Sequence, residues 1–194
     1  MISRIDHISI AVADYPKALD FFRKFLGAVP GASARDDRLQ FVWEIFSAGD
    51  LSRLELLTPT GPDSFLKRFL SEKPGGVHHI TFETPDIRAA KARLDELGIP
   101  CFGFSDSDPE WKELFIHPKD AFGVLIQIAE FRPDEFLADT VRLAGSHPWH
   151  LEKTPSGGRL TVRHPGGGTA ALNLSREEIG RLAADLTAFL DETP

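Results

Sequence analysis

Two histidines, one glutamate and one glutamine interrupt strand-like stretches of this chain in a pattern that could bind a metal ion. His7 lies in RIDHISIAV, Glu55 in RLELLT, His79 in GVHHITFE and Gln127 in GVLIQIA. His7 and His79 are 72 residues apart, and the same spacing separates Glu55 from Gln127. Two imidazoles, a carboxylate and an amide oxygen form a mixed nitrogen and oxygen set that suits Co, Ni, Mn, Fe or Zn. The pattern therefore predicts one divalent metal site built from two related halves.

Strand phase distinguishes between the two adjacent histidines. Successive side chains of a strand point to opposite faces. His78 shares a face with the apolar residue Ile80, whereas His79 lies on the other face. His7 likewise lies opposite the apolar face of its own strand. A lone strand histidine is more often a satisfied core or surface residue, but phase and spacing together favour His79 as a ligand.

Glu44 is a further polar residue in an apolar strand, within FVWEIF. A carboxylate is costly to bury as a charge, so such a residue either faces a cleft or has a raised pKa. Both situations suit a general base. The local sequence leaves the alternative open that Glu44 lies on the exposed face of an edge strand.

Other reactive residue types carry weaker signals. Cys101 is the only cysteine, which excludes an internal disulfide and favours a small buried side chain. His147, His150 and His164 lack cysteine or carboxylate partners at metal-ligand spacing, so we interpret them as surface residues. The glycines of HPGGGT lack the frame of a phosphate-binding loop and indicate a hairpin turn.

The elements that must position the candidate ligands occur twice within the first 130 residues. Each half contains a strand, then a helix that begins at an aspartate and ends at a glycine, then further strands. The expected helices span 14–27 and 86–98, with a short helix over 65–70. The expected strands are Arg4 to Val12, Leu39 to Phe46, Arg53 to Thr58, Val77 to Glu83, Trp111 to Ile116 and Gly123 to Ile128. This order predicts an α+β fold of two βαβββ modules, over about residues 3–60 and 76–130.

Residues 131–194 do not repeat this pattern. A helix is expected over 134–143, a hairpin over 160–164 and 169–174, and a second helix over 175–190. Ser175 and Glu178 form a capping box for the last helix. We therefore expect a first domain over 1–130 and a small C-terminal α+β appendage, helix-hairpin-helix in outline, that serves packing or homodimer formation.

Length and charge restrict the class of protein. A chain of 194 residues can bury one full core with a small appendage. The net charge of -7 and the pI near 5.5 argue against nucleic acid or an anionic membrane as a partner, because both require a basic face. No apolar run reaches the ~18 residues that span a bilayer, and the N-terminus lacks signal-peptide features. We expect a cytoplasmic protein that acts on a small molecule.

Four segments resemble the methylmalonyl-CoA epimerases, within the vicinal oxygen chelate superfamily of glyoxalases, bleomycin resistance proteins and dioxygenases. They are RIDHISIAV, RLELLTP, GVHHITFET and HPKDAFGVLIQI, and the resemblance covers about residues 3–130. It implies a curved sheet that encloses a metal ion. The family's metal positions fall on four residues: His7, Glu55, His79 and Gln127.

The resemblance also implies roles for three other residues. Glu44 falls on a position proposed as a catalytic acid or base, and His117 and Lys119 fall on the HPK segment, where we expect substrate binding. One position departs from the family, because its last ligand is normally glutamate and this chain has Gln127. An amide does not accept the substrate proton, so a mechanism that uses this carboxylate as a second base does not apply unchanged.

The resemblance implies a metal-dependent epimerase that removes the α-proton of a 2-carboxyacyl-CoA through a stabilised enolate, with Glu44 as the group that moves the proton. Two alternatives remain: a glyoxalase-I-like lyase or isomerase on another small substrate, and a non-catalytic ligand-sequestering protein of the bleomycin-resistance type. A ring-cleaving dioxygenase fits less well, because it requires two histidines and one carboxylate with an open triad. Metal retained after purification would distinguish an enzyme from a sequestering protein.

Overall fold

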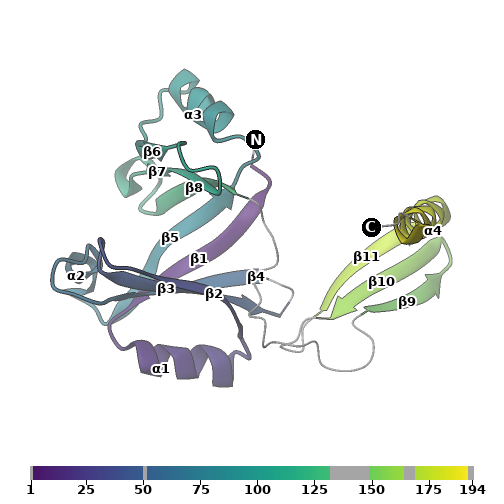
Figure 1. Cartoon of the computed structure of the whole chain (residues 1–194), viewed down its shortest axis with the longest axis horizontal. Coiled ribbons are helices and arrows are strands. Elements are labelled where there is room, and N and C mark those ends of the chain that lie inside the picture. The colour runs from purple at the N-terminus through teal and green to yellow at the C-terminus, as the bar shows by residue number, and fades with distance from the viewer. Residues whose placement is uncertain (1, 50–51, 132–148, 164–168, 192–194) are drawn as a thin grey trace. The chain divides into compact units, whose positions relative to one another are not determined.

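The computed structural model describes residues 2–49, 52–131, 149–163 and 169–191, which belong to two compact units (Figure 1). The first unit holds the described residues up to 131, except for the short segment around residue 49. The second holds those from 149 onward. Within the described residues, no helix is long and apolar enough to cross a membrane.

The first unit is built on an eight-stranded mixed sheet with the order β2-β3-β4-β1-β5-β8-β7-β6. Its strands are β1 Arg4–Val12, β2 Val29–Asp36, β3 Phe41–Ala48, β4 Ser52–Pro59, β5 Gly75–Glu83, β6 Phe102–Ser105, β7 Trp111–Ile116 and β8 Leu125–Phe131. Strands β1 and β5 are antiparallel neighbours at the middle, and each pairs in parallel with the last strand of its own module. The predicted α+β fold of two βαβββ modules is confirmed.

Each module has a helix on one face of its half of the sheet (Figure 1). The first helical segment is α1 Tyr15–Asp20, continued by the π-helical turn η1 Phe21–Phe25, and the second is α3 Ile87–Glu96. Asp14 and Asp86 cap these helices as predicted, each accepting a hydrogen bond from a backbone N–H three residues on. The remaining helical pieces are α2 Leu66–Leu70 and the 3₁₀ turn η2 Pro118–Asp120.

One apolar core lies between α1 and the sheet, and another lies between α3 and the sheet. Phe22 packs with Phe46 and Leu56 in the first module, and Leu94 packs with Leu114 in the second. Because strand side chains alternate, the residues between these core positions emerge on the other face of the sheet. That face receives the predicted metal ligands.

Two strands of this sheet were not predicted from the sequence, β2 and β6, and they are its edge strands. Their sequences, VPGASARD and FGFS, contain glycine, proline and small residues, and β6 buries none of its side chains. An edge strand pairs on one side only and needs little apolar alternation, so the periodicity that reveals inner strands is weak there.

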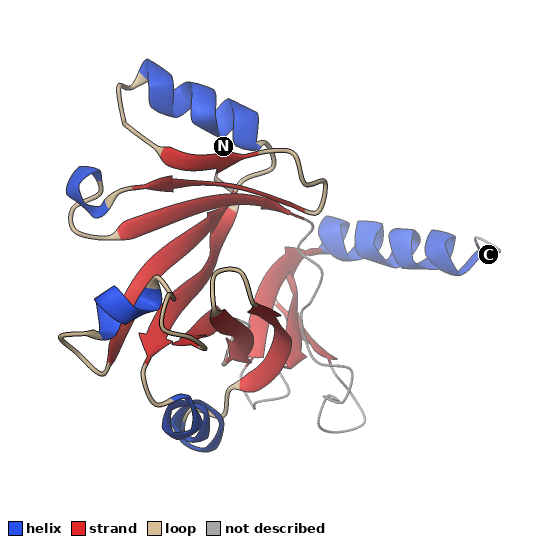
Figure 2. Ribbon diagram, turned by 60° about the vertical axis from the view of Figure 1, so that its left-hand side comes forward, coloured by secondary structure: helices blue, strands red, loops and turns tan. Residues whose placement is uncertain are grey.

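The second unit is a three-stranded antiparallel sheet, in the order β11-β10-β9, followed by a long helix. Its elements are β9 Trp149–Thr154, β10 Gly157–Arg163, β11 Thr169–Ser175 and α4 Arg176–Asp191. Figure 2 shows α4 continuing beyond the end of this sheet. The predicted hairpin and the capping box of Ser175 and Glu178 are confirmed, whereas β9 was not predicted. The helix expected over 134–143 lies outside the described residues, and the packing or dimer-forming role of this unit stays a prediction.

Candidate metal centre

Three of the four predicted ligands converge on neighbouring strands. His7 on β1, Glu55 on β4 and His79 on β5 each offer a ligand atom within 4.8 Å of the others, and all three side chains are buried. His7 Nε2 lies 3.6 Å from Glu55 Oε2, and His79 Nε2 lies 3.8 Å from the same oxygen. Two imidazoles and one carboxylate that face each other in a buried site form a donor set that fits a divalent transition metal.

The sheet register explains why residues 72 positions apart meet. Ile8 pairs with Ile80 across the β1–β5 ladder, and these two are themselves related by the repeat spacing. A pseudo-two-fold axis therefore passes between them, and it brings His7 and His79 to the same face on either side. Within each module the last strand adds one residue to that face, Glu55 in the first and Gln127 in the second.

Two buried hydroxyl groups make equivalent contacts in the two halves. Ser9 Oγ donates to Glu55 Oε2 and lies 2.8 Å from His79 Nε2. Thr81 Oγ1 donates to Gln127 Oε1 at 2.6 Å and lies 2.9 Å from His7 Nε2. The amide oxygen of Gln127 therefore adjoins the three-residue cluster through Thr81, as the fourth predicted donor.

Asp6 orients His7 by a contact with the ring nitrogen that does not face Glu55. Its Oδ2 lies 2.7 Å from His7 Nδ1, and its other oxygen contacts Arg53 and Arg4. Burial by itself would raise the pKa of Asp6, but the hydrogen bond with His7 and the charges of His7, Arg53 and Arg4 lower it overall. A carboxylate that accepts from Nδ1–H leaves Nε2 as the ligating nitrogen, which is the usual support of a metal-bound histidine.

Burial disfavours charge on the ligands themselves. It raises the pKa of the Glu55 carboxyl, an effect that His7 and the Ser9 hydrogen bond partly oppose. Burial, followed by the neighbouring His78 and His7, holds the pKa of His79 well below its ordinary value. His79 is therefore a neutral imidazole with a lone pair available to a metal. A bound cation would offset the cost of an ionised Glu55 in this buried setting.

His78 lies beside the cluster and not in it. Its ring packs against Phe65 and Phe69, with centroid distances of 5.6 and 5.1 Å, and its Nδ1 lies 2.9 Å from His79 Nδ1. Burial, with a smaller contribution from Lys73, lowers the pKa of His78. The structure thus places His79 in the cluster with His7 and Glu55, and it places His78 between His79 and two phenylalanine rings.

Glu44 lies on the other face of the sheet from the ligands. In the β3–β4 ladder Ile45 pairs with Glu55, whereas Glu44 pairs with Leu56, which belongs to the core under α1. The Glu44 carboxylate accepts a hydrogen bond from the hydroxyl of Tyr15 on α1. Burial, and then Glu44, raise the pKa of Tyr15. The structure therefore does not bring Glu44 together with His7, Glu55 and His79. The acid or base role of Glu44 stays a prediction.

A second carboxylate that the sequence analysis did not select lies beside Gln127. Glu113 Oε2 on β7 accepts a hydrogen bond from Gln127 Nε2 at 2.6 Å and one from Trp111 Nε1 at 2.9 Å. The signal that selected Glu44 was also present here, because Glu113 interrupts the apolar strand WKELFI. The alternate residues Leu114 and Ile116 lie in the core, so Glu113 points to the ligand face.

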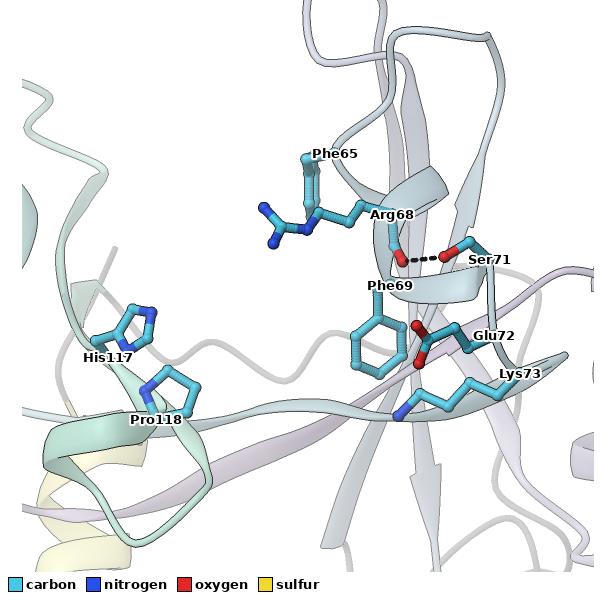
Figure 3. Close-up of a pocket in the computed structure, with 8 residues that line it drawn as sticks. All are labelled: Phe65, Arg68, Phe69, Ser71, Glu72, Lys73, His117 and Pro118. Atoms are coloured by element: carbon cyan, nitrogen blue, oxygen red, sulfur yellow. Dashed lines mark hydrogen bonds between the residues drawn. The ribbon is translucent and has the colours of Figure 1, made fainter.

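A pocket of about 660 Å³ opens between the two modules, next to His78. The segment around α2 contributes most of its lining, and His117 and Pro118 at η2 contribute the rest (Figure 3). Arg68, Lys73 and His117 supply donors or positive charge, and Lys73 Nζ lies 4.0 Å from the centre of the Phe69 ring. Lys119 is not part of the lining; its Nζ lies 3.9 Å from Asp120. His7, Glu55 and His79 do not line this pocket, but two of its lining rings, Phe65 and Phe69, contact His78, which is next to His79.

Comparison with known proteins gives matches over up to about two thirds of the chain. The family model of the Glyoxalase/Bleomycin resistance protein/Dioxygenase superfamily matches residues 6–115, a range that contains His7, Glu55 and His79. An ethylmalonyl-CoA/methylmalonyl-CoA epimerase of Cereibacter sphaeroides is 38% identical over 136 residues, which cover 67% of this chain and 99% of that protein. The mitochondrial methylmalonyl-CoA epimerase of Homo sapiens is 32% identical over 135 residues, 66% of this chain and 74% of that protein.

Solved structures match over a similar share of the chain. A methylmalonyl-CoA epimerase in complex with methylmalonyl-CoA and NH4+ gives a TM-score of 0.61 at 29% identity, covering 70% of this chain and 99% of that one. The enzyme from Mycobacterium tuberculosis gives a TM-score of 0.61 at 27% identity, covering 68% and 90%.

Proposed function

Because the chain belongs to the glyoxalase/bleomycin resistance protein/dioxygenase superfamily, we propose that it is a metal-dependent epimerase of 2-carboxyacyl-CoA thioesters such as methylmalonyl-CoA. The observation that carries this proposal is the buried cluster of His7, Glu55 and His79, held on three adjacent strands of a sheet shared with epimerases. The relatives of 38% and 32% identity support the same reaction class.

The proposed reaction removes the proton between the thioester and the carboxylate and returns one to the opposite face. A divalent cation held by His7, Glu55, His79 and Gln127 would supply charge stabilisation for the enolate oxygens. Asp6 fixes the orientation of His7, and Ser9 links Glu55 to His79, so the ligand atoms are positioned before substrate binds. Burial of the cluster limits the access of water and strengthens its electrostatic interactions.

Glu44 is the residue predicted from the sequence to move the proton. In the structure, this role requires that the Glu44 side chain change its position. Its carboxylate contacts Tyr15 on the face of the sheet that α1 covers, opposite Glu55. To act on a substrate held at the cluster of His7, Glu55 and His79, the Glu44 side chain has to leave Tyr15 and reach the other face of β3. A substitution at this position therefore tests the proposed base directly.

We further propose that the pocket beside His78 binds the coenzyme A portion of the substrate. Arg68, Lys73 and His117 suit phosphate groups, and the phenylalanine rings offer apolar surface. Arg68→Ala should raise KM for an acyl-CoA by about 10-fold, the equivalent of roughly 1.4 kcal/mol, and should leave KM for the matching acyl-pantetheine unchanged. Arg88→Ala, an exposed arginine of α3 outside the pocket, is the matched control. Equal effects on both thioesters would exclude phosphate binding by Arg68.

The reaction itself is tested by metal analysis of the purified protein and by α-proton exchange in heavy water. Methylmalonyl-CoA and ethylmalonyl-CoA should exchange the α-proton and invert the centre, whereas propionyl-CoA, which lacks the 2-carboxylate, should not exchange its α-protons. His7→Ala serves as a metal-deficient control. Bound metal without exchange on any 2-carboxyacyl-CoA would reject the epimerase and favour a lyase or isomerase on another substrate.

A further inference from the structure

The two halves of the ligand cluster differ at two neighbouring strand positions. Glu55 and Gln127 occupy equivalent places in the two modules. On the neighbouring strand, Glu55 pairs with Ile45 and Gln127 pairs with Phe115. The residues two positions before these partners are Trp43 in the first module and Glu113 in the second. A carboxylate therefore accompanies the amide ligand, whereas an aromatic residue accompanies the carboxylate ligand. We infer that Glu113 is a positioning residue that fixes the Gln127 amide with its oxygen toward the metal site.

The chemistry of the two side chains determines the direction of the amide. An ionised carboxylate only accepts hydrogen bonds, so the end of the Gln127 amide that faces Glu113 must be the NH2 group. The 2.6 Å contact joins Gln127 Nε2 to Glu113 Oε2, and the amide oxygen accepts from Thr81 on the other side. Thr81 alone could not impose this direction, because its hydroxyl can donate to an oxygen or accept from an NH2.

Glu113 is itself held in place. The indole N–H of Trp111, which can only donate, bonds the same Oε2 at 2.9 Å. The Trp111 ring stacks on Phe131 with a centroid distance of 4.9 Å. The carboxylate thus has a fixed position from which it selects one of the two amide orientations.

The functional consequence follows from the neutrality of the amide. Glutamate has two equivalent oxygens and would present one to a cation in either orientation, whereas a reversed glutamine would present an NH2 group and repel the cation. Glu113 makes Gln127 a defined oxygen donor. This inference rests on the metal site of the proposed function, but metal affinity requires no turnover and is read separately from it.

The test is a double-mutant cycle on the full-length protein, with Co²⁺ affinity measured by calorimetry. Glu113→Leu removes the acceptor that holds the Gln127 NH2 group, and it should lower the affinity about 10- to 100-fold, as substitutions behind metal ligands do. In the Gln127→Glu background the same change should cost nothing or should raise the affinity, because a carboxylate ligand needs no orientation and the neighbouring negative charge is removed. Glu130→Leu is the matched control: it removes a carboxylate on the adjacent strand that contacts Lys112, and it should leave the affinity unchanged.

Thermal unfolding of the metal-free variants checks that all of them fold, and the visible spectrum of bound Co²⁺ provides a second readout of the coordination. A loss in Glu113→Leu that disappears in the Gln127→Glu background supports the positioning role. An equal loss in both backgrounds overturns it, as does wild-type affinity in Glu113→Leu. A wild-type protein that binds no Co²⁺ also overturns it, whatever substrate the exchange assay identifies.

Discussion

Replacing Asp6 with asparagine should weaken both metal binding and the fold, because this buried carboxylate joins three donor groups beneath the cluster. Its oxygens lie 2.7 Å from His7 Nδ1, 2.9 Å from Arg4 Nη2 and 3.2 Å from Arg53 Nη1. Asparagine keeps the shape and one acceptor oxygen but removes the charge. The substitution therefore tests the support of His7 without removing a ligand.

The size of the effect follows from the partners that remain. Removing one member of a buried ion pair costs about 3–5 kcal/mol, and a hydrogen bond to a charged group contributes about 1.5–3 kcal/mol. Arg4 is partly exposed and keeps its hydrogen bond to Glu83 at 2.8 Å. Because asparagine also retains an acceptor, we expect a loss of about 2–3 kcal/mol in the free energy of unfolding. Metal affinity should fall about 10- to 100-fold.

The pH dependence has a defined sign. The pKa of Asp6 is lowered in the folded protein, although burial alone would raise it. A carboxyl group of this kind stabilises the fold above its unfolded pKa of about 3.9, and this contribution is lost as the pH falls through the lower folded pKa. The stability difference between wild type and Asp6→Asn should therefore be full at about pH 6, shrink below about pH 4 and vanish at still lower pH.

Urea unfolding in the presence of a chelator, repeated across this pH range, measures the stability difference without interference from metal. Calorimetry at neutral pH measures the affinity. Asp20→Asn is the matched control, because that carboxylate forms an exposed pair with Lys24. Wild-type stability of Asp6→Asn at neutral pH, or a difference that does not shrink in acid, would refute the reasoning.

Three further predictions concern the ligands, the proposed base and the C-terminal unit. His79→Ala should abolish stoichiometric metal with little loss of fold, whereas His78→Ala should cost about 1–3 kcal/mol of stability and retain metal; mass spectrometry decides, and metal controlled by His78 alone would make the assignment wrong. Glu44→Gln should keep its metal and lose α-proton exchange by about 10²-fold or more if Glu44 is the base; full exchange activity would eliminate it. Truncation after Phe131 should leave the metal site assembled, because all four predicted ligands precede that residue; metal analysis and sedimentation test this, and joint loss of metal and solubility would make the last unit integral to the core.

Much of the architecture could be predicted because its signals are local. Asp14 and Asp86 mark the starts of the two helices, because each caps its helix through a hydrogen bond to a residue only three positions on. The strand around His7 alternates so regularly that its two faces can be assigned without a structure. The repeat spacing then relates His7 to His79. In the structure, Ile8 and Ile80, which are separated by the same number of residues, are paired at the centre of the sheet.

The sequence by itself determined the α+β class, the two modules and the phase of the strands that carry the four predicted ligands, because these depend on alternation and capping within short segments. Only the tertiary structure decided which way Glu44 points and that Glu113 contacts Gln127. FVWEIF is apolar on both faces, so its phase is fixed by pairing with β4 and not by its own pattern. Glu113 reaches Gln127 through the register of β7 against β8, a long-range pairing that neither strand specifies alone.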